Sequence, residues 1–341
     1  MRIRRAQIEV NKFGPNPEAD ETANLWFSSE MLQGQLVEFR YVALVDAQDY
    51  PSLNRQESTG IVYVGDDGGI SRLFFLPCCN PSSGSTPQPL TDGFIANPKF
   101  PSASVGGCLV AFEAAPTLGS DGRRIFSLDL LNGAIKRLTV DQGPNQSSND
   151  FHPVFNLDGS RFAMITTRSG SNTSLNVEDS FIGLSGGQGT VVVSGTTGVG
   201  ASDADWSHGR NEIAFTDLFG RISTVDPVSK IIKVVGSGNN PRFSPGGEKI
   251  GYLSANSLFV MDRDGGNNHS IPNAGGVPAQ GDLTWVDDHT IAMPRTVGGN
   301  TNIYLIDTNT SASVKLTVGS TDTNPTFVRC IVRRAQITGE P

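Results

Sequence analysis

The stretch NPRFSPGGEKIGYLSANSLFVMD, residues 240–262, holds one complete copy of a repeat that runs through most of the chain. It opens with an Asn-Pro lead-in and an aromatic residue, reverses through Ser-Pro-Gly-Gly, and continues with two apolar runs, the second of which ends in Asp262. The same order recurs in DADWSHGRNEIAFTDLFGRISTVD (203–226) and LTWVDDHTIAMPRTVGGNTNIYLID (283–307), and in a longer version over 97–129. Repetition at about 40 residues, in units of short strands, is typical of β-propeller blades.

The aromatic residue of the lead-in gives a common point for aligning the copies. It falls at Phe100, Phe155, Trp206, Phe243, Trp285 and Phe327. We expect each near the end of the innermost strand of a blade, because Pro, Gly and Asp shortly after it favour a tight turn. An earlier copy spans roughly Gly34 to Ala96, and five more begin near Asn97, Asn149, Ala201, Asn239 and Gly281. The sequence therefore predicts an all-β, six-bladed β-propeller.

The C-terminal segment from Asn324 to Pro341 opens like another repeat but is long enough for only one or two strands. Because an unclosed ring leaves two unpaired strand edges, we expect this segment to complete the blade begun by N-terminal sequence. The strings Ile3-Arg-Arg-Ala-Gln-Ile8 and Val332-Arg-Arg-Ala-Gln-Ile337 point to strands near that seam. The expected organisation is an N-terminal extension over 1–33 that holds a closure strand, followed by the propeller over 34–341. A seventh blade built from both termini is the alternative.

Two further strands of each repeat follow from apolar alternation. The second strand places two apolar side chains on one face in Ile61/Tyr63, Val110/Phe112, Phe162/Met164, Ile213/Phe215, Ile250/Tyr252 and Ile291/Met293. We expect these pairs to pack blade against blade. The third strand ends in Asp129, Asp226, Asp262 or Asp307, which predicts a hairpin turn into an outer strand. Leu-Thr pairs mark that outer strand in three copies, at residues 90–91, 138–139 and 316–317.

The segment from Thr167 to Gly200 is rich in Gly and Ser and does not divide into strands, so we expect a long connection between blades. Leu184-Ser-Gly-Gly-Gln188 matches the signature loop of ABC-type ATPases, but the chain contains no Gly-Lys pair of a P-loop. Gly183 to Gly187 matches G-x-S-x-G, the nucleophile elbow of α/β-hydrolases, but nothing indicates the parallel sheet that this motif requires. A Gly/Ser-rich loop accounts for both matches.

Composition supports one all-β domain and argues against several functions. The chain has 341 residues with 39 Gly, 20 Pro and only 18% charged residues, which suits many tight turns between short strands. The net charge is −8 and no window concentrates Lys and Arg beyond Arg2–Arg5 and Arg333–Arg334, so we expect no nucleic-acid partner. No apolar run approaches the roughly 20 residues of a membrane-spanning helix. The oligomeric state is left open.

Cysteine usage bears on the compartment. Cys78, Cys79, Cys108 and Cys330 allow three full pairings, and an even count in a chain rich in Asn, Ser and Thr suits an oxidising environment. Buried free thiols are the alternative. The residues after Met1 lack the apolar core of a signal peptide. We expect a periplasmic or extracellular location with Met1 following a removed leader; a cytoplasmic location is the alternative.

The repeat over residues 240–267, with its lead-in, aromatic residue, Ser-Pro-Gly-Gly turn, Ile-x-Tyr strand and Met-Asp-x-Asp-Gly-Gly hairpin, resembles the WD40-like Pd40 repeats of TolB-type β-propellers. The resemblance covers residues from Asn97 to about Phe327. Val286-Asp-Asp-His and the last repeat lack the Ser-Pro-Asp-Gly turn, and residues 1–33 match nothing in the family. The resemblance implies a soluble, usually extracytoplasmic domain that binds proteins or serves as a scaffold. It does not by itself specify a function.

Metal sites have little support. Asp262-Arg-Asp264-Gly-Gly-Asn267 is similar to the front of a calcium loop, but the distal Glu is absent and a hairpin already explains Asp-Gly here. The four His residues lie in separate repeats without zinc-ligand spacing. We therefore expect no metal or other cofactor, with Ca²⁺ at this hairpin as the weaker alternative.

The candidate binding site follows from propeller geometry, because the innermost strands of all blades begin around one mouth of the central channel. The polar residues at those positions are Asp150, His152, Asp203, Asp205, Asn240, Asp282 and Asn324. Converging carboxylates and amides there would focus negative potential and bind a cation or a basic peptide segment. The alternative is that Asn and Asp merely cap turns before Pro.

Two functions remain. The first is a non-enzymatic propeller that binds a protein partner, or serves as a scaffold subunit of an extracytoplasmic assembly. The second is a hydrolase or lyase that acts on a glycan or peptide at the channel mouth. Convergence of at least three of Asp150, His152, Asp203, Asp205 and Asp282 within hydrogen-bond reach of a buried cavity would favour the enzyme, whereas side chains that point apart or cap turns would remove its candidate site. No catalytic residue is assigned from the sequence.

Overall fold

The structure is a computed structural model of the chain and describes residues 55–77, 86–91, 96–104, 108–115, 122–139, 149–157, 159–168, 173–179, 189–195, 200–272, 274, 276 and 282–333. The chain divides into two compact units, one of Met1–Gln56 with Val332–Pro341 and one of Glu57–Ile331. The second unit is the propeller. The predicted N-terminal extension over 1–33 and the hexapeptide at Ile3–Ile8 lie outside the described residues. No helix in the described ranges is long and apolar enough to span a membrane.

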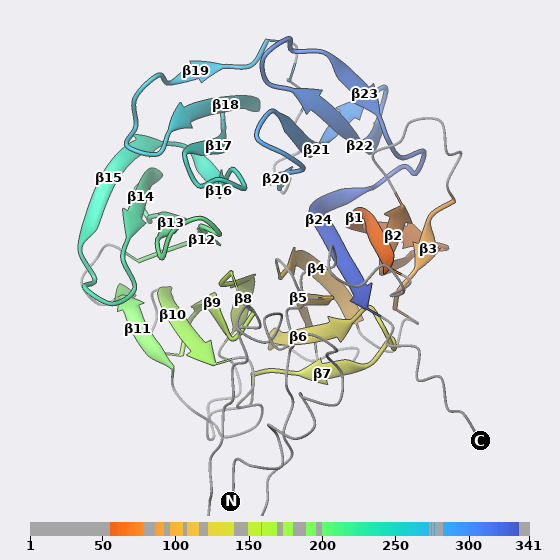
Figure 1. Cartoon of the computed structure of the whole chain (residues 1–341), viewed down its shortest axis with the longest axis horizontal. Helices are drawn as coiled ribbons and strands as arrows, with labels where there is room; N and C mark the ends of the chain where they lie inside the picture. Colours follow the sequence, from red (N-terminus) through yellow and green to blue (C-terminus); the bar gives the residue numbers. More distant parts are fainter. Residues whose placement is uncertain are drawn as a thin grey trace, which may run out of the picture. The chain divides into compact units, whose positions relative to one another are not determined.

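Six antiparallel four-stranded sheets surround a central axis (Figure 1). Blade 1 combines β24 (Thr323–Arg333), β1 (Arg55–Asp67), β2 (Ile70–Pro77) and β3 (Gln88–Pro89). Blade 2 is β4 (Ala96–Ala103), β5 (Leu109–Ala115), β6 (Arg124–Asp129) and β7 (Ile135–Arg137). Blade 3 is β8 (Asp150–Phe155), β9 (Arg161–Thr166), β10 (Ser174–Asp179) and β11 (Thr190–Val193). The six-bladed prediction is confirmed.

The other three blades follow the same order from the axis outward. Blade 4 is β12 (Asp203–Trp206), β13 (Ile213–Thr216), β14 (Arg221–Val225) and β15 (Ile232–Ser237). Blade 5 is β16 (Asn239–Phe243), β17 (Lys249–Ser254), β18 (Ser257–Asp262) and β19 (His269–Ser270). Blade 6 is β20 (Thr284–Trp285), β21 (Thr290–Val297), β22 (Asn300–Asp307) and β23 (Ser313–Lys315).

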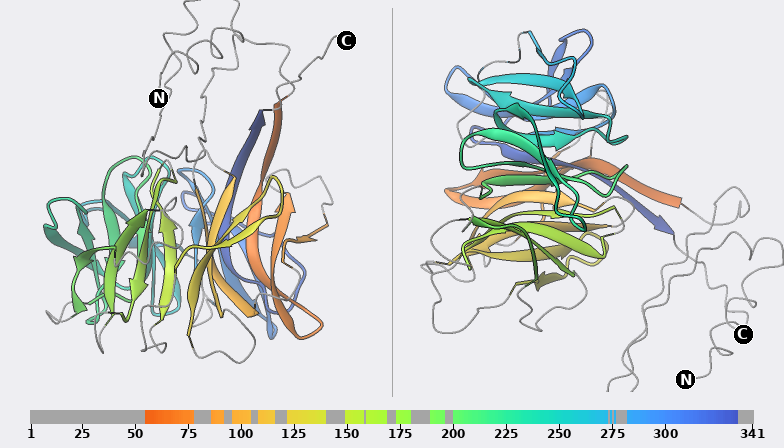
Figure 2. Two further views of the ribbon diagram at one scale, coloured as in Figure 1. Left: turned by 90° about the horizontal axis from the view of Figure 1, so that it is seen from below. Right: turned by 90° about the vertical axis from the view of Figure 1, so that its left-hand side faces the viewer.

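The ring closes through blade 1, whose innermost strand comes from the C-terminal end of the chain. Strand β24 lies beside β1, and the two run next to each other in every view (Figures 1 and 2). The C-terminal segment therefore completes the blade begun by N-terminal sequence, as the sequence predicts, and the closed ring leaves no unpaired seam.

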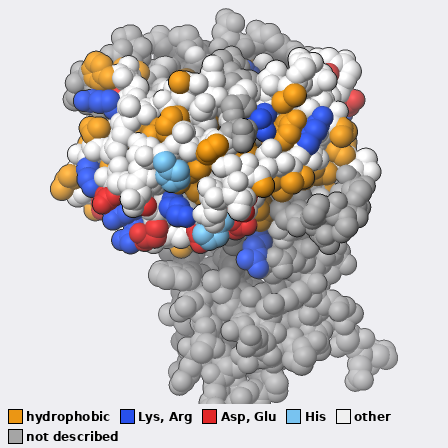
Figure 3. Space-filling model, turned by 90° about the horizontal axis from the view of Figure 1, so that it is seen from above, with side chains coloured by type: hydrophobic (Ala, Val, Ile, Leu, Met, Phe, Trp, Pro, Cys, Tyr) orange, Lys and Arg blue, Asp and Glu red, His pale blue; other side chains and the backbone are white. Residues whose placement is uncertain are grey.

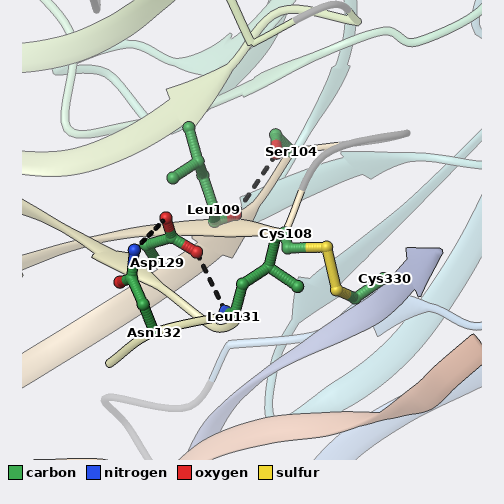
Figure 4. The surroundings of a disulfide bond; sticks show 7 residues. All are labelled: Ser104, Cys108, Leu109, Asp129, Leu131, Asn132 and Cys330. Carbon is green, nitrogen blue, oxygen red and sulfur yellow. Dashed lines mark hydrogen bonds between the residues drawn. A yellow bond between two sulfur atoms is a disulfide. The ribbon is translucent and has the colours of Figure 1, made fainter. Parts of the chain in front are cut away.

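A disulfide bond reinforces this seam. Cys330 on β24 is bonded to Cys108, which directly precedes β5 of blade 2, with a Cα–Cα distance of 4.7 Å (Figure 4). The sequence left three pairings open; Cys78 and Cys79 lie outside the described residues. A covalent bond thus joins the blade that contains the first and last described strands, β1 and β24, to blade 2.

The core lies between blades, where the predicted second-strand pairs meet. All twelve of their side chains are at most 3% exposed. One cluster joins Ala214 and Ile222 of blade 4 to Phe243, Ile250 and Tyr252 of blade 5. Another joins Ala111 and Ile125 of blade 2 to Phe155, Phe162 and Met164 of blade 3. Apolar alternation in the sequence therefore marks the surfaces on which adjacent blades pack, and burial of this kind contributes about 25 cal/mol per Å².

The Asp at the end of the third strand caps the turn into the outer strand. The carboxylates of Asp129, Asp226 and Asp307 each accept a backbone N–H two residues later, at 2.9, 2.7 and 2.9 Å. At the fourth position Asp262 accepts the side-chain amide of Asn267, and Asp264 accepts the N–H of Gly266 at 3.0 Å. The calcium-like string is thus held by turn hydrogen bonds within the hairpin.

The Thr of each Leu-Thr pair has a specific structural role. Its hydroxyl accepts a buried backbone N–H of the third strand: Leu73 to Thr91 at 3.1 Å, Ile125 to Thr139 at 3.0 Å and Ile303 to Thr317 at 3.0 Å. All three Thr residues are at most 4% exposed. The hydroxyl replaces a backbone acceptor at the point where the short outer strand ends.

We predict that Thr139→Val lowers the free energy of unfolding by about 1–3 kcal/mol, because the buried Ile125 N–H loses its acceptor while side-chain volume is kept. Urea unfolding of the variant tests this. Thr139→Ser retains the hydroxyl and should recover most of the loss. A loss in Thr139→Ser with none in Thr139→Val would show that methyl packing, and not the hydrogen bond, matters at this position.

Two predictions about strands are wrong. The segment 167–200 is not a connection between blades, because β10 and β11 of blade 3 lie within it, joined in register to β9 and to each other. Its strands are masked in the sequence by buried polar residues such as Ser174 and Asn176. Residues 180–188, with Ser185 and the Leu-Ser-Gly-Gly-Gln string, fall between β10 and β11 and lie outside the described residues.

The second wrong prediction is the alignment of blade 2 on Phe100. Ala103 pairs with Val110, as Trp206 pairs with Ile213 and Phe243 with Ile250, so Ala103 holds the position of the aromatic residue. Phe100 lies three residues earlier, at the lead-in position. Inserted residues around Asn97 shift the register of β4 twice, which lengthens this strand.

Candidate functional site: the axial cavity

A cavity of about 640 Å³ lies on the propeller axis and is lined by residues of all six blades. At the beginning of the inner strands its walls include Phe100, His152 and Pro325, and at their far end His208 and Pro245. The inner strands of the six blades converge on the axis, so residues of every repeat meet the same space (Figure 1). The cavity therefore runs the length of the inner strands.

Four of these inner strands reach the cavity through the same backbone irregularity. A residue with positive φ precedes Pro in Phe100-Pro101 (47°), His152-Pro153 (49°), Asn240-Pro241 (53°) and Asn324-Pro325 (50°). The strand register shifts at the first three of these sites. Because Pro has no backbone N–H, the bulge leaves no donor unpaired at that residue. The bulge also changes the direction of the side chain that precedes the Pro. Lead-in residues therefore come from equivalent positions of different blades.

Arg242 forms the centre of the charged groups beside the cavity. Its guanidinium contacts Asp203 Oδ1 at 3.1 Å and Asp282 Oδ2 at 2.5 Å, and it also donates to the carbonyl oxygens of Pro241 and Ala204. Arg242, Asp203 and Asp282 are 9%, 3% and 4% exposed. Burial alone would disfavour the cation, but these two carboxylates and Asp205 raise the pKa of Arg242, which stays charged. The cluster joins blades 4, 5 and 6.

Asp205 differs from the other two carboxylates. It lines the cavity, and its Oδ2 accepts the backbone N–H of Phe243 at 2.7 Å from the neighbouring blade. Burial raises the pKa of Asp205 to about 7, with Arg242 and the Phe243 N–H opposing the shift and Asp282 and Asp203 adding to it. Asp205 therefore changes protonation near neutral pH, inside the cavity.

His152 of blade 3 and Phe100 of blade 2 form another part of the cavity wall. The His152 ring packs edge-to-face on Phe100, with centroids 3.9 Å apart, and its Nδ1 lies 2.7 Å from the Ser202 carbonyl oxygen and 3.7 Å from Asp203. The backbone N–H of His152 donates to Glu113 of blade 2 at 3.0 Å. On the other side, burial lowers the pKa of His208 to about 4, so this cavity-lining imidazole is neutral at physiological pH.

The predicted site residues have different fates. His152, Asp205 and Asp282 line the cavity, and Asp203 joins them through Arg242. Asn240 and Asn324 hold the positive-φ lead-in position, where Asn324 is 4% exposed. Asp150 belongs elsewhere: it is fully buried in blade 3, where it accepts the Thr166 hydroxyl and pairs with Arg168 at 2.5 Å. Three of the five residues named for the enzyme alternative, His152, Asp205 and Asp282, therefore line the cavity. The carboxylates among them also hold neighbouring blades together, because Asp282 pairs with Arg242 and Asp205 accepts the N–H of Phe243.

Sequence reasoning missed Arg242, Phe100 and Arg329, which all line the cavity. Arg242 occupies the position directly before the aromatic residue, and Asp205, Thr284 and Thr326 occupy the same position in other blades. Side chains at this position accept an N–H of the next blade in three cases: Asp205 from Phe243, Thr284 from Phe327 and Thr326 from Ala103. Alignment of the X-Pro dipeptides marks this position in four of the six copies; the strands that end in Trp206 and Trp285 have Ala204 and Leu283 in place of the Pro.

Among the described residues no group of three or more His, Cys, Asp or Glu side chains has the geometry to hold a metal ion. The three carboxylates of the cluster surround a guanidinium instead of an open centre. The arrangement favours recognition of a ligand by charge and shape.

We predict that Asp205→Asn stabilises the protein at pH 8 and has little effect at pH 5. The pKa of Asp205 in the folded protein lies above its unfolded value near 3.9, so its contribution to stability is present at low pH and is lost as pH rises through about 7. The Asn side chain keeps an acceptor for Phe243 without the buried charge. Denaturant unfolding at both pH values measures the effect; equal destabilisation at pH 5 and pH 8 would contradict it.

Comparison with known proteins supports the fold at low sequence identity. No protein-family model matches the chain, and no curated protein matches it. A crystal structure of TolB from Acinetobacter baumannii is similar with a TM-score of 0.63 and 14% identity, covering 79% of this chain and 66% of that one. A nidogen/laminin complex structure gives 0.58 and 11%, covering 79% and 98%. Apo AztD from Citrobacter koseri gives 0.51 and 11%, covering 80% and 99%. The chain therefore has the six-bladed fold of the TolB-type β-propellers.

Proposed function

We propose that this protein is a non-enzymatic β-propeller that binds a protein partner through its axial cavity, as a subunit of an extracytoplasmic assembly. The observation that carries the proposal is a cavity of about 640 Å³ lined by all six blades. Its most buried charges are Arg242, Asp203 and Asp282, and the single guanidinium pairs with both carboxylates. These ion pairs fix the positions of the inner strands of blades 4, 5 and 6 around the cavity. Phe100 and Phe327 line the cavity and are partly exposed, so they offer apolar surface to a ligand.

The location outside the cytoplasm is supported by the disulfide between Cys108 and Cys330, since such bonds persist in oxidising compartments. A protein partner is favoured over nucleic acid because the net charge is −8 and basic side chains are interspersed with acidic ones on the face shown in Figure 3. TolB-type propellers have this fold, and the resemblance of the repeat to theirs points in the same direction.

A capture experiment with paired variants tests the proposal. Ser102 lines the cavity, and Ser102→Trp should fill part of it; Ser237→Trp places the same side chain on the exposed outer strand β15. In native extract, a partner retained by wild type and by Ser237→Trp should be lost by Ser102→Trp. A partner retained equally by both variants would contradict binding through the cavity.

A hydrolase or lyase is the second candidate, and Asp205 is the observation that favours it. A carboxyl group with a pKa of about 7 in a cavity has the property expected of a general acid or base. Assays of glycan and peptide cleavage with wild type and Asp205→Asn separate the two functions. Turnover that Asp205→Asn abolishes would support the enzyme, and turnover by neither protein would leave the binding function.

A further inference from the structure

The charges around the cavity are unbalanced toward the negative. Asp205, Asp282, Asp287 and Asp288 line it, against the two cations Arg242 and Arg329. In the most buried part, three carboxylates, those of Asp203, Asp205 and Asp282, surround the single guanidinium of Arg242. One cation does not neutralise three ionised carboxylates, so this part of the cavity favours a further positive group.

One carboxylate oxygen of this cluster has no hydrogen-bond partner among the described residues, and a second carboxylate lines the cavity. Asp203 is 3% exposed; its Oδ1 contacts Arg242, while its buried Oδ2 has no hydrogen-bond partner in the described part of the chain. Asp205 uses Oδ2 for the Phe243 N–H and faces the cavity. The unpaired Oδ2 of Asp203 adds negative potential beside the cavity, and Asp205 is the carboxylate of the two that lines it.

The walls around these carboxylates suit a hydrocarbon stem. Phe100, Phe243, Trp285, Phe327 and Val286 all line the cavity, and Phe100, Phe327 and Val286 are partly exposed. Aromatic faces attract cations as well as alkyl groups. Acidic groups at the end of an apolar wall match a ligand with a charged head and an apolar body.

We infer that the cavity binds an alkylammonium or guanidinium group on a hydrocarbon stem, with Asp205 as its counter-ion. This inference rests on the proposed function and specifies the chemistry of its ligand. The group comes either from a Lys or Arg side chain of a protein partner or from a free amine.

Binding of the cation should be linked to proton release. Asp205 is faced by Arg242 of β16, by Asp203 of its own strand and by Asp282 before β20, with His152 and His208 on the same cavity. His208 is neutral above about pH 5, because its pKa is lowered to about 4. Since free Asp205 has a pKa of about 7, the affinity for a cation should fall about thirtyfold from pH 8 to pH 5.5.

Calorimetric titration of the intact protein tests the inference with four probes. These are n-pentylamine and its neutral counterpart n-pentanol, and acetyl-Gly-Lys-Gly-amide and its norleucine counterpart. We expect both cationic probes to bind, to lose about thirtyfold in affinity from pH 8 to pH 5.5, and to lose this dependence in Asp205→Asn. Asp264→Asn, an exposed carboxylate in the β18–β19 hairpin, is the matched control and should bind like wild type.

The outcomes separate the sources and the hypotheses. Tighter binding of the Lys peptide identifies a partner side chain, and tighter binding of pentylamine identifies a free amine. The inference is overturned if neither cation binds, if the neutral probes bind equally, or if Asp205→Asn keeps affinity and pH dependence. Failure here with continued loss of partner capture in Ser102→Trp would leave the proposed function standing.

Discussion

Cys330→Ala should lower the free energy of unfolding by about 5 kcal/mol, the largest effect expected from any single substitution discussed for this protein. The bond between Cys108 and Cys330 closes a loop with a sequence separation of 222 residues. In the chain-entropy account, a cross-link over that span removes about 5 kcal/mol of disorder from the unfolded chain. Because β24 alone closes the ring at blade 1, losing the bond also weakens the seam.

Denaturant unfolding of four proteins measures this effect. Cys108→Ala, Cys330→Ala and the double variant should lose the same amount, because each removes the same bond, and wild type with a reductant should match them. If the loss of stability in the double variant instead equals the sum of the losses in the two single variants, side-chain packing and not the bond accounts for the effect. A loss under about 1 kcal/mol would show that the bond adds little to the closed ring.

Arg242→Met should destabilise the protein by about 3–5 kcal/mol, since it leaves two buried carboxylates without their counter-ion. Asp203 and Asp282 are 3% and 4% exposed, and both contact the guanidinium. Burial raises the pKa of Asp282 and Arg242 opposes that shift, so without Arg242 its pKa rises further. The deficit should therefore be largest near pH 8 and smaller near pH 5, where this carboxyl group binds a proton.

Two matched variants isolate the cause. Arg210→Met removes an ion pair that is also short, 2.6 Å to Glu248, but exposed to solvent, and it should cost far less stability than Arg242→Met. Combining Arg242→Met with Asp203→Asn and Asp282→Asn removes the buried charges and should recover most of the loss. A deficit that is independent of pH and unaffected by the two Asn substitutions would contradict the electrostatic account.

The fold was accessible from the sequence because each blade depends on local patterns. Ile250 and Tyr252 alternate on one face of β17, a turn follows Phe243, and Asp262 ends the third strand, all within one repeat. These features act over a few residues, so each of the six repeats predicts the same blade independently. The prediction of blade 3 was incomplete because β10 lacks this local pattern: buried polar residues such as Asn176 interrupt the apolar alternation.

The site was accessible only in part, because its contacts join different repeats. Arg242 meets Asp203 and Asp282 across sequence separations of 39 and 40 residues, about one repeat in each direction. Ring geometry predicts that such positions converge, which is why Asp203, Asp205 and Asp282 could be named. The type of residue before the aromatic differs from blade to blade and so does not mark that position as facing a cavity, and the insertion near Asn97 hid the equivalence of Phe100 and His152.

The axial cavity as the binding site is the central claim, and site-directed photocrosslinking tests it most directly. A photoreactive phenylalanine analogue replaces Ser102, which lines the cavity, or Ser237, which lies exposed on β15, and each intact protein is irradiated in native extract. The account predicts one dominant protein adduct from position 102 and none of comparable yield from position 237. Adducts from position 237 alone, or in equal yield from both positions, would contradict it.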